Sequence, residues 1–248
     1  MDTAAAPVSA QPEEIGSFGR LIRVIVNPRP TFESIVRRPS FVLPIVIGMI
    51  FFALIVTIFT QRGGWPSFFE KQDAKNSRVQ QLPPEKQQEL LNQQIKVAAP
   101  FGYVEAVILP ILSAVIVAAI FFGLFNLTGS SKFGFAVALG IVAFAWTPWI
   151  IHGILGTVIV SLKDPTTIDL ENLVASNPAA FLSDDAPKWL SALLGSIDLF
   201  AIWTMILLAI GFSATNPKKL SFAKSFSFVF AAWLFFVLVK VGMTSLFS

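Results

Sequence analysis

Five long runs of apolar, uncharged residues constrain the fold of this chain more than any other feature. The hydrocarbon core of a bilayer is ~30 Å thick, and a helix of about 20 residues crosses it. Each run reaches that length and carries at most one ionisable residue. The sequence therefore predicts an all-α, polytopic membrane protein, a bundle of five transmembrane helices over residues 41–60, 101–127, 135–160, 190–212 and 225–247.

Composition agrees with a membrane protein and excludes several kinds of site. Hydrophobic residues make up 54% of the chain and charged residues 13%, against roughly 25% charged in a soluble domain. With no cysteine and only one histidine, His152, the chain cannot form a disulfide, a thiolate nucleophile or a multi-histidine metal centre. No serine motif places a nucleophile near this histidine. We expect no catalytic residue, no metal, no cofactor and no enzymatic activity.

The amino-terminal segment divides into a tail and two short helices. Residues 1–14 lack apolar runs and are predicted to be a disordered tail, with one membrane domain over 15–248. Apolar residues at helical spacing over 15–26 predict a helix in the membrane interface. Two prolines after Asn27 must end it, and a second helix is expected over 31–38. Five arginines of this segment are candidate contacts for lipid headgroups: Arg20, Arg23, Arg29, Arg37 and Arg38.

The segments between the runs indicate the orientation. Residues 61–100 are polar and contain a predicted water-exposed helix over 85–96, started by Pro83 and Pro84. The loop over 161–189 is acidic. Because the arginine cluster precedes the first run, we expect a cytoplasmic amino terminus, an external carboxyl terminus and contact with an anionic inner leaflet. The formal charge of +3 is too small and too dispersed to indicate nucleic acid.

Four stretches resemble the Yip family, the five-span proteins named after Ypt/Rab-interacting proteins, in its prokaryotic branch. They are LIRVIVNPRPTFESI (21–35), VAFAWTPWII (142–151), SIDLFAIWTMILLAIGF (196–212) and AKSFSFVFAAW (223–233). The resemblance implies a five-span integral membrane protein. In a prokaryote, such a protein is expected in the inner (plasma) membrane. Eukaryotic relatives bind prenylated GTPases and shape membranes. A segment like their DLYGP is not recognisable here, so GTPase binding is not carried over.

Four ionisable residues lie within the predicted runs. They are Glu105, His152, Asp198 and Lys240, at depths of ~6 to ~12 Å counted on the helical rise. The alternating direction of the runs puts all four in the predicted outer half. A charge in hydrocarbon costs several kcal/mol unless it is paired or hydrated.

Three interpretations of this polar layer remain open. Asp198 and Lys240 could form a buried ion pair with His152 as a hydrogen-bonding neighbour. The layer could instead open to water and bind a headgroup, a proton or a small ion, or its alignment could be accidental. Near His152, Trp146, Pro148 and Trp149 indicate a helix kink, packing or interface anchors, with an aromatic cage as the alternative.

The function that these features indicate is membrane organisation or recruitment of an unknown membrane protein partner, without enzymatic activity. The first alternative is a small transporter or channel that uses the polar layer, and the second is a lipid-modifying enzyme. A transporter requires a water-accessible route to Asp198, and an enzyme requires a second polar group that converges on His152.

Overall fold

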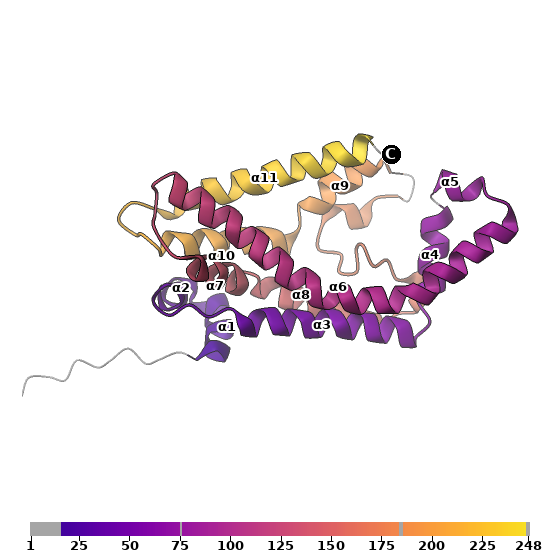
Figure 1. Cartoon of the computed structure of the whole chain (residues 1–248), viewed down its shortest axis with the longest axis horizontal. Coiled ribbons are helices and arrows are strands. Elements are labelled where there is room, and N and C mark those ends of the chain that lie inside the picture. The colour runs from indigo at the N-terminus through magenta and orange to yellow at the C-terminus, as the bar shows by residue number, and fades with distance from the viewer. Residues whose placement is uncertain (1–15, 75, 184–185, 247–248) are drawn as a thin grey trace, which may run out of the picture.

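The computed structural model describes residues 16–74, 76–183 and 186–246, and the predicted tail lies outside them. All regular elements of these described residues are helices. The longest helices run along the long axis of the molecule (Figure 1). The two amino-terminal helices lie at one end of that axis, whereas the last helix ends towards the other.

The amino-terminal segment forms α1 (Ser17–Val26) and α2 (Pro28–Arg37). Asn27 separates them, which confirms the predicted break. The second helix begins three residues earlier than predicted because Pro28 occupies its first turn, where a missing amide proton costs nothing.

Three helices match predicted runs, and one of them is much longer than predicted. Helix α3 (Val42–Gln61) and helix α11 (Phe222–Leu246) lie close to their predicted bounds. The expected separate helix over 85–96 is wrong, because residues 84–127 form one continuous helix, α6 (Pro84–Leu127), of 44 residues. Pro100 and Pro110 lie inside it, as proline is tolerated in membrane helices whose neighbours satisfy the freed carbonyls.

The other two runs are broken helices. The first comprises α7 (Phe135–Ala145) and α8 (Thr147–Leu162), which meet at Trp146 just before Pro148. The second comprises α9 (Lys188–Ser196) and α10 (Leu199–Ser213), bent by 45°. Among the residues described, four helical segments are long and apolar enough to cross a membrane: α3, α6, α7 together with α8, and α11. The number is five if α9 and α10 form one span.

Smaller elements gather towards the end opposite the amino-terminal helices. They are α4 (Trp65–Ala74), α5 (Ser77–Gln80) and two 3₁₀ turns, η1 (Pro165–Thr167) and η2 (Pro178–Phe181). Ile168 of the long loop packs with Phe59 and Val160 in a small second core. Arg62 donates hydrogen bonds to the carbonyls of Val160 (2.7 Å) and Lys163 (2.6 Å), so it caps the end of α8.

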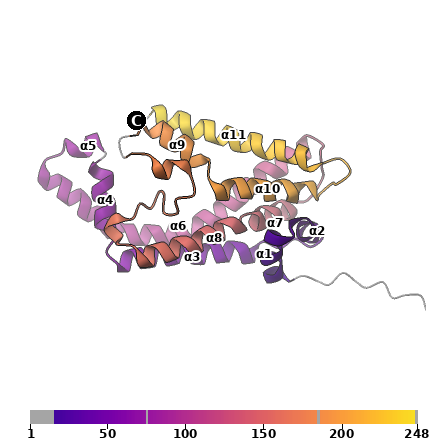
Figure 2. The same ribbon diagram turned by 180° about the vertical axis from the view of Figure 1, so that it is seen from behind.

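The main core lies around α7 and α10, and the view from behind shows α10 between α11 and the end-to-end helices α7 and α8 (Figure 2). Every residue of α7 over 138–145 is buried. Phe32 and Ile35 of α2 are fully buried in this core, as is Val24 of α1. A methyl group on Gly211 of α10 would lie 2.5 Å from the Ile141 side chain, so the glycine permits this close packing. The amino-terminal helices therefore pack one face into the bundle, which the sequence did not predict.

Candidate functional sites

Arg20 is a structural residue, and its prediction as a headgroup contact is wrong. Its side chain is buried and donates to the Arg38 carbonyl (2.9 Å), the Ser40 hydroxyl (2.9 Å) and the Ser34 carbonyl (3.3 Å). These acceptors surround the end of α2, where helical carbonyls lack partners. Burial, and to a smaller extent the charge of Arg37, lowers the pKa of the Arg20 guanidinium. The residue thus holds α1 against the end of α2.

Helix α1 also carries an exposed apolar stripe. Phe18, Ile22 and Val26 are 68%, 57% and 74% exposed and lie four residues apart, on one face of the helix. Leu21 and Val24 lie on the opposite face and are buried in the core. The sequence pattern merged these two faces into one, because periodicity alone does not show which apolar residues a neighbouring helix covers.

The exposed side of the same end is basic. Arg23, Arg37 and Arg38 are exposed, whereas the largely exposed Arg29 places its Nε 3.6 Å from Glu33 Oε1. We call this region the basic end. Among the residues that the structure describes, Glu33 is the one acidic residue there. It contains Arg20, Arg23, Arg29, Arg37, Arg38, Lys132, Lys218, Lys219 and Lys224.

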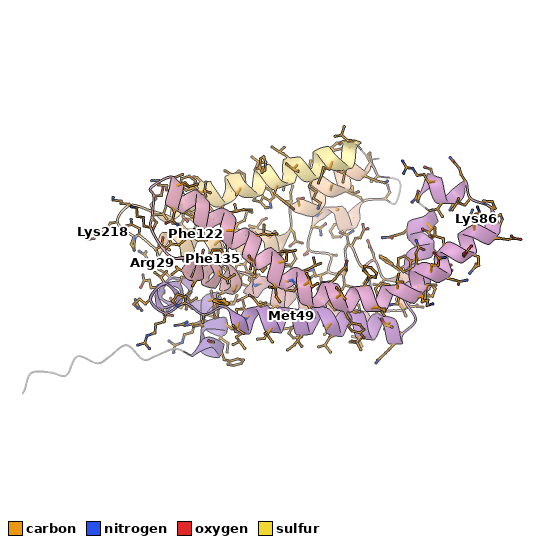
Figure 3. All side chains as sticks on the ribbon, viewed as in Figure 1. Arg29, Met49, Lys86, Phe122, Phe135 and Lys218 are labelled. Carbon is orange, nitrogen blue, oxygen red and sulfur yellow. The ribbon has the colours of Figure 1, made fainter. Side chains whose placement is uncertain are left out.

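The loops of the basic end are joined to one another. The Thr215 hydroxyl donates to the Ser131 hydroxyl at 2.8 Å, which ties the α6–α7 loop to the α10–α11 loop. The opposite end of the described chain has seven basic and seven acidic residues outside the apolar runs. Figure 3 shows Arg29 and Lys218 at one end and Lys86 at the other. The molecule therefore has a strong charge asymmetry along its long axis.

Asp198 is a helix cap. It stands between α9 and α10, and its carboxylate accepts from the amides of Phe200 (2.7 Å) and Ala201 (3.2 Å). The Ser176 hydroxyl donates to its other oxygen, and the side chain is buried. The free amides at the start of α10 and the positive end of its dipole therefore stabilise the carboxylate.

The predicted ion pair between Asp198 and Lys240 is absent. The ion pair within the described ranges is the one between Arg29 and Glu33. The physical reason is that the break before α10 already satisfies the carboxylate, so a lysine is not needed. Lys240 stays half-buried on α11.

His152 lies on α8 in an aromatic cluster. Its ring centroid is 5.2 Å from those of Trp149 and Phe200, the latter edge-on. Phe200, whose amide donates to the Asp198 carboxylate, brings the start of α10 beside the imidazole. The structure therefore brings Asp198 near His152, and Glu105 lines the same cavity as His152.

That cavity, which we call the α3–α8 slot, has a volume of about 880 Å³. Helix α3 forms one wall, α6 and α8 form the others, and aromatic side chains of α4 also line the cavity. Its lining is mainly apolar, with Gln94, Glu105, Ser113 and His152 as the polar side chains other than tryptophan. The slot was not predicted, because no sequence pattern shows how α3, α6 and α8 are spaced.

Trp146, Trp149 and two glycines shape the slot. The helix break at Trp146 confirms the predicted kink, and both tryptophans line the slot. A methyl group on Gly153 would lie 2.9 Å from Phe51, and one on Gly102 would lie 2.9 Å from Val56. These glycines let α8 and α6 approach α3 closely.

The fold and these sites define a class: an α-helical membrane protein with a packed, basic amino-terminal segment. The model of the Yip1 domain family matches residues 22–243, and the chain belongs to this family. The match confirms the resemblance to the Yip family that the four stretches indicate. No curated protein and no solved structure matches the chain.

Proposed function

We propose that this Yip1 domain protein organises the membrane at its basic end, without catalysing a reaction, and recruits partners there. The observation that carries the proposal is the exposed apolar stripe of Phe18, Ile22 and Val26 beside exposed arginines. Such a stripe lowers its free energy by entering the boundary between headgroups and acyl chains. The exposed arginines beside the stripe would then contact the phosphates of lipid headgroups.

The charge asymmetry supports a cytoplasmic basic end. Short segments rich in lysine and arginine remain on the cytoplasmic side of spans. Each basic residue near an anionic surface contributes about 1 kcal/mol of attraction. The amino terminus would then be inside and, with five crossings, the carboxyl terminus outside.

The attachment of α1 to the bundle distinguishes it from a free amphipathic helix. Leu21 and Val24 anchor one face in the core, and Arg20 fixes the helix to α2. The stripe is therefore held at a set depth relative to the spans. A rigid element inserted in one leaflet displaces headgroups there and gathers anionic lipids around the protein.

The expected partners are the anionic inner leaflet and a membrane protein of unknown identity. Residence in the inner (plasma) membrane of a bacterium rests on the resemblance to the prokaryotic branch. No specific observation favours the transporter or channel alternative.

The test measures which lipids surround the full-length protein. Membrane patches that contain the protein are excised with a styrene–maleic acid copolymer, and their anionic lipid fraction is compared with that of the whole membrane. We expect enrichment of anionic lipid around the unchanged protein. Replacing Phe18, Ile22 and Val26 by serine should reduce it, because α1 would leave the leaflet.

The matched control changes exposed apolar residues at the opposite end. Leu162 and Phe181 are 78% and 81% exposed, and their replacement by serine should leave the enrichment unchanged. Equal lipid composition around the unchanged protein and the α1 variant would refute the proposal.

A further inference from the structure

We propose that the α3–α8 slot binds the hydrocarbon chain of an amphiphile whose cationic amine head pairs with Glu105. The volume of about 880 Å³ falls within the range of small-molecule sites, roughly 300 to 1,000 Å³. The lining of α6 extends from Gln94 to Ser113, which is ~28 Å along the helix. An elongated apolar site of this length suits an aliphatic chain.

Glu105 is the polar group that selects the head. It lines the slot, lies within an apolar run and has no hydrogen-bond or ion-pair partner in the ranges that the structure describes. A carboxylate in hydrocarbon requires a partner. The slot lining, as described, contains no lysine or arginine to supply one.

His152 lies near the level of Glu105. Two close contacts relate the helices: Gly102 of α6 meets Val56 of α3, and Gly153 of α8 meets Phe51, five residues back along α3. Helix α6 runs antiparallel to α3, whereas α8 runs parallel to it. Counted from these contacts with the helical rise per residue, the positions of Glu105 and His152 along the helix axes differ by about 5 Å.

The surrounding groups favour a positive head over a negative one. Trp149 packs on His152 and lines the slot, so it offers an aromatic face near the level of Glu105. Ammonium groups bind such faces through the ring quadrupole. Towards α4, the Gln94 Oε1 atom is buried without a donor, so a second acceptor lines the slot. A carboxylate or phosphate head would face acceptors and the Glu105 charge.

The ligand enters from the bilayer. Phe101 and Trp149 line the slot and are 64% and 40% exposed, both within apolar runs. The slot is therefore open to the hydrocarbon along its side. An amphiphile already dissolved in the membrane reaches it without crossing water.

The test uses the tryptophans as reporters. Trp65, Trp146 and Trp149 line the slot, and a bromine atom on a bound chain quenches tryptophans that it contacts. Brominated dodecylamine, dodecanol and dodecanoate are added at equal mole fractions to the full-length protein in neutral maltoside micelles. The amine should reach half-maximal quenching at about a tenfold lower mole fraction than the alcohol, from one charge-assisted bond.

Two variants assign the effect to the slot. Glu105→Gln should remove the preference for the amine and leave quenching by the alcohol unchanged. Gly48 lines the slot, and a methyl group there would meet nothing within 4 Å, so Gly48→Phe should fill the slot and weaken quenching by all three probes. Gly123→Phe is the control, because Gly123 is equally unobstructed but does not line the slot.

Three results would overturn the proposal. The first is equal quenching by the amine and the alcohol. The second is an amine preference that survives Glu105→Gln. The third is unchanged quenching in Gly48→Phe and in the smaller Gly48→Leu, which would assign the signal to probe dissolved in the micelle.

Discussion

Replacing Asp198 by alanine should destabilise the protein by about 3 kcal/mol. Removal of a helix cap costs about 0.5 to 2 kcal/mol. The alanine variant also loses the hydrogen bond that Ser176 donates to the Asp198 carboxylate. A hydrogen bond to a charged acceptor is worth about 1.5 to 3 kcal/mol. Asp198→Asn keeps an oxygen that accepts from the Phe200 and Ala201 amides, so it should cost less than the alanine variant.

The assay is unfolding by sodium dodecyl sulfate in mixed micelles, followed by tryptophan fluorescence. Double-mutant cycles identify the partner of the carboxylate. Ser176→Ala and Asp198→Ala should be non-additive, because each removes the same hydrogen bond. Lys240→Met and Asp198→Ala should add within about 0.5 kcal/mol.

The opposite pattern would refute the capping interpretation. If Lys240→Met coupled to Asp198→Ala by more than about 1 kcal/mol, while Ser176→Ala simply added, the carboxylate would be paired with the lysine. The reasoning from the α9–α10 break would then be wrong.

Two further predictions concern packing of the amino-terminal helices. Arg20→Met should lower the free energy of unfolding by about 3 kcal/mol, because its charge-assisted hydrogen bonds are lost. Arg23 is exposed, so Arg23→Met should change that free energy by less than about 0.5 kcal/mol in the same assay. Equal effects of the two variants would contradict a structural role for Arg20. Gly211→Ala should cost about 1 to 3 kcal/mol because the methyl group overlaps Ile141, whereas Gly242→Ala, in open space, should be neutral or stabilising. Equal shifts in the thermal unfolding midpoints of Gly211→Ala and Gly242→Ala would contradict the close contact between Gly211 and Ile141.

Hydropathy located the spans well but did not show where the backbone breaks. Helix α3 agrees with its predicted bounds to within one residue at each end. The apolar boundary near residue 100 is a change of environment along α6, and the helix passes through it unbroken. Hydropathy measures what surrounds a residue, whereas the backbone follows local hydrogen bonding.

The break at Asp198 had a signal in the sequence that was overlooked. An aspartate directly before an apolar run is a common helix cap, but inside an apolar run it was interpreted as a charge that needs a counterion. Glu105 and His152 were candidates from the sequence, and both line the α3–α8 slot. Their meeting in one slot depends on how α3, α6 and α8 pack, which is a tertiary property.

The membrane placement of the basic end is tested most directly by cysteine accessibility, since the chain has no native cysteine. Single cysteines replace Arg29, Lys218 and Lys86 in the full-length protein, and intact cells are treated with a membrane-impermeant maleimide. We predict labelling of the Lys86 position alone, and labelling of all three after the membrane is opened. In opened membranes, a cysteine at Ile22 should stay protected while one at Arg23 reacts. Labelling of the Arg29 and Lys218 positions from outside, or equal reactivity at Ile22 and Arg23, would contradict a cytoplasmic basic end with α1 in the leaflet.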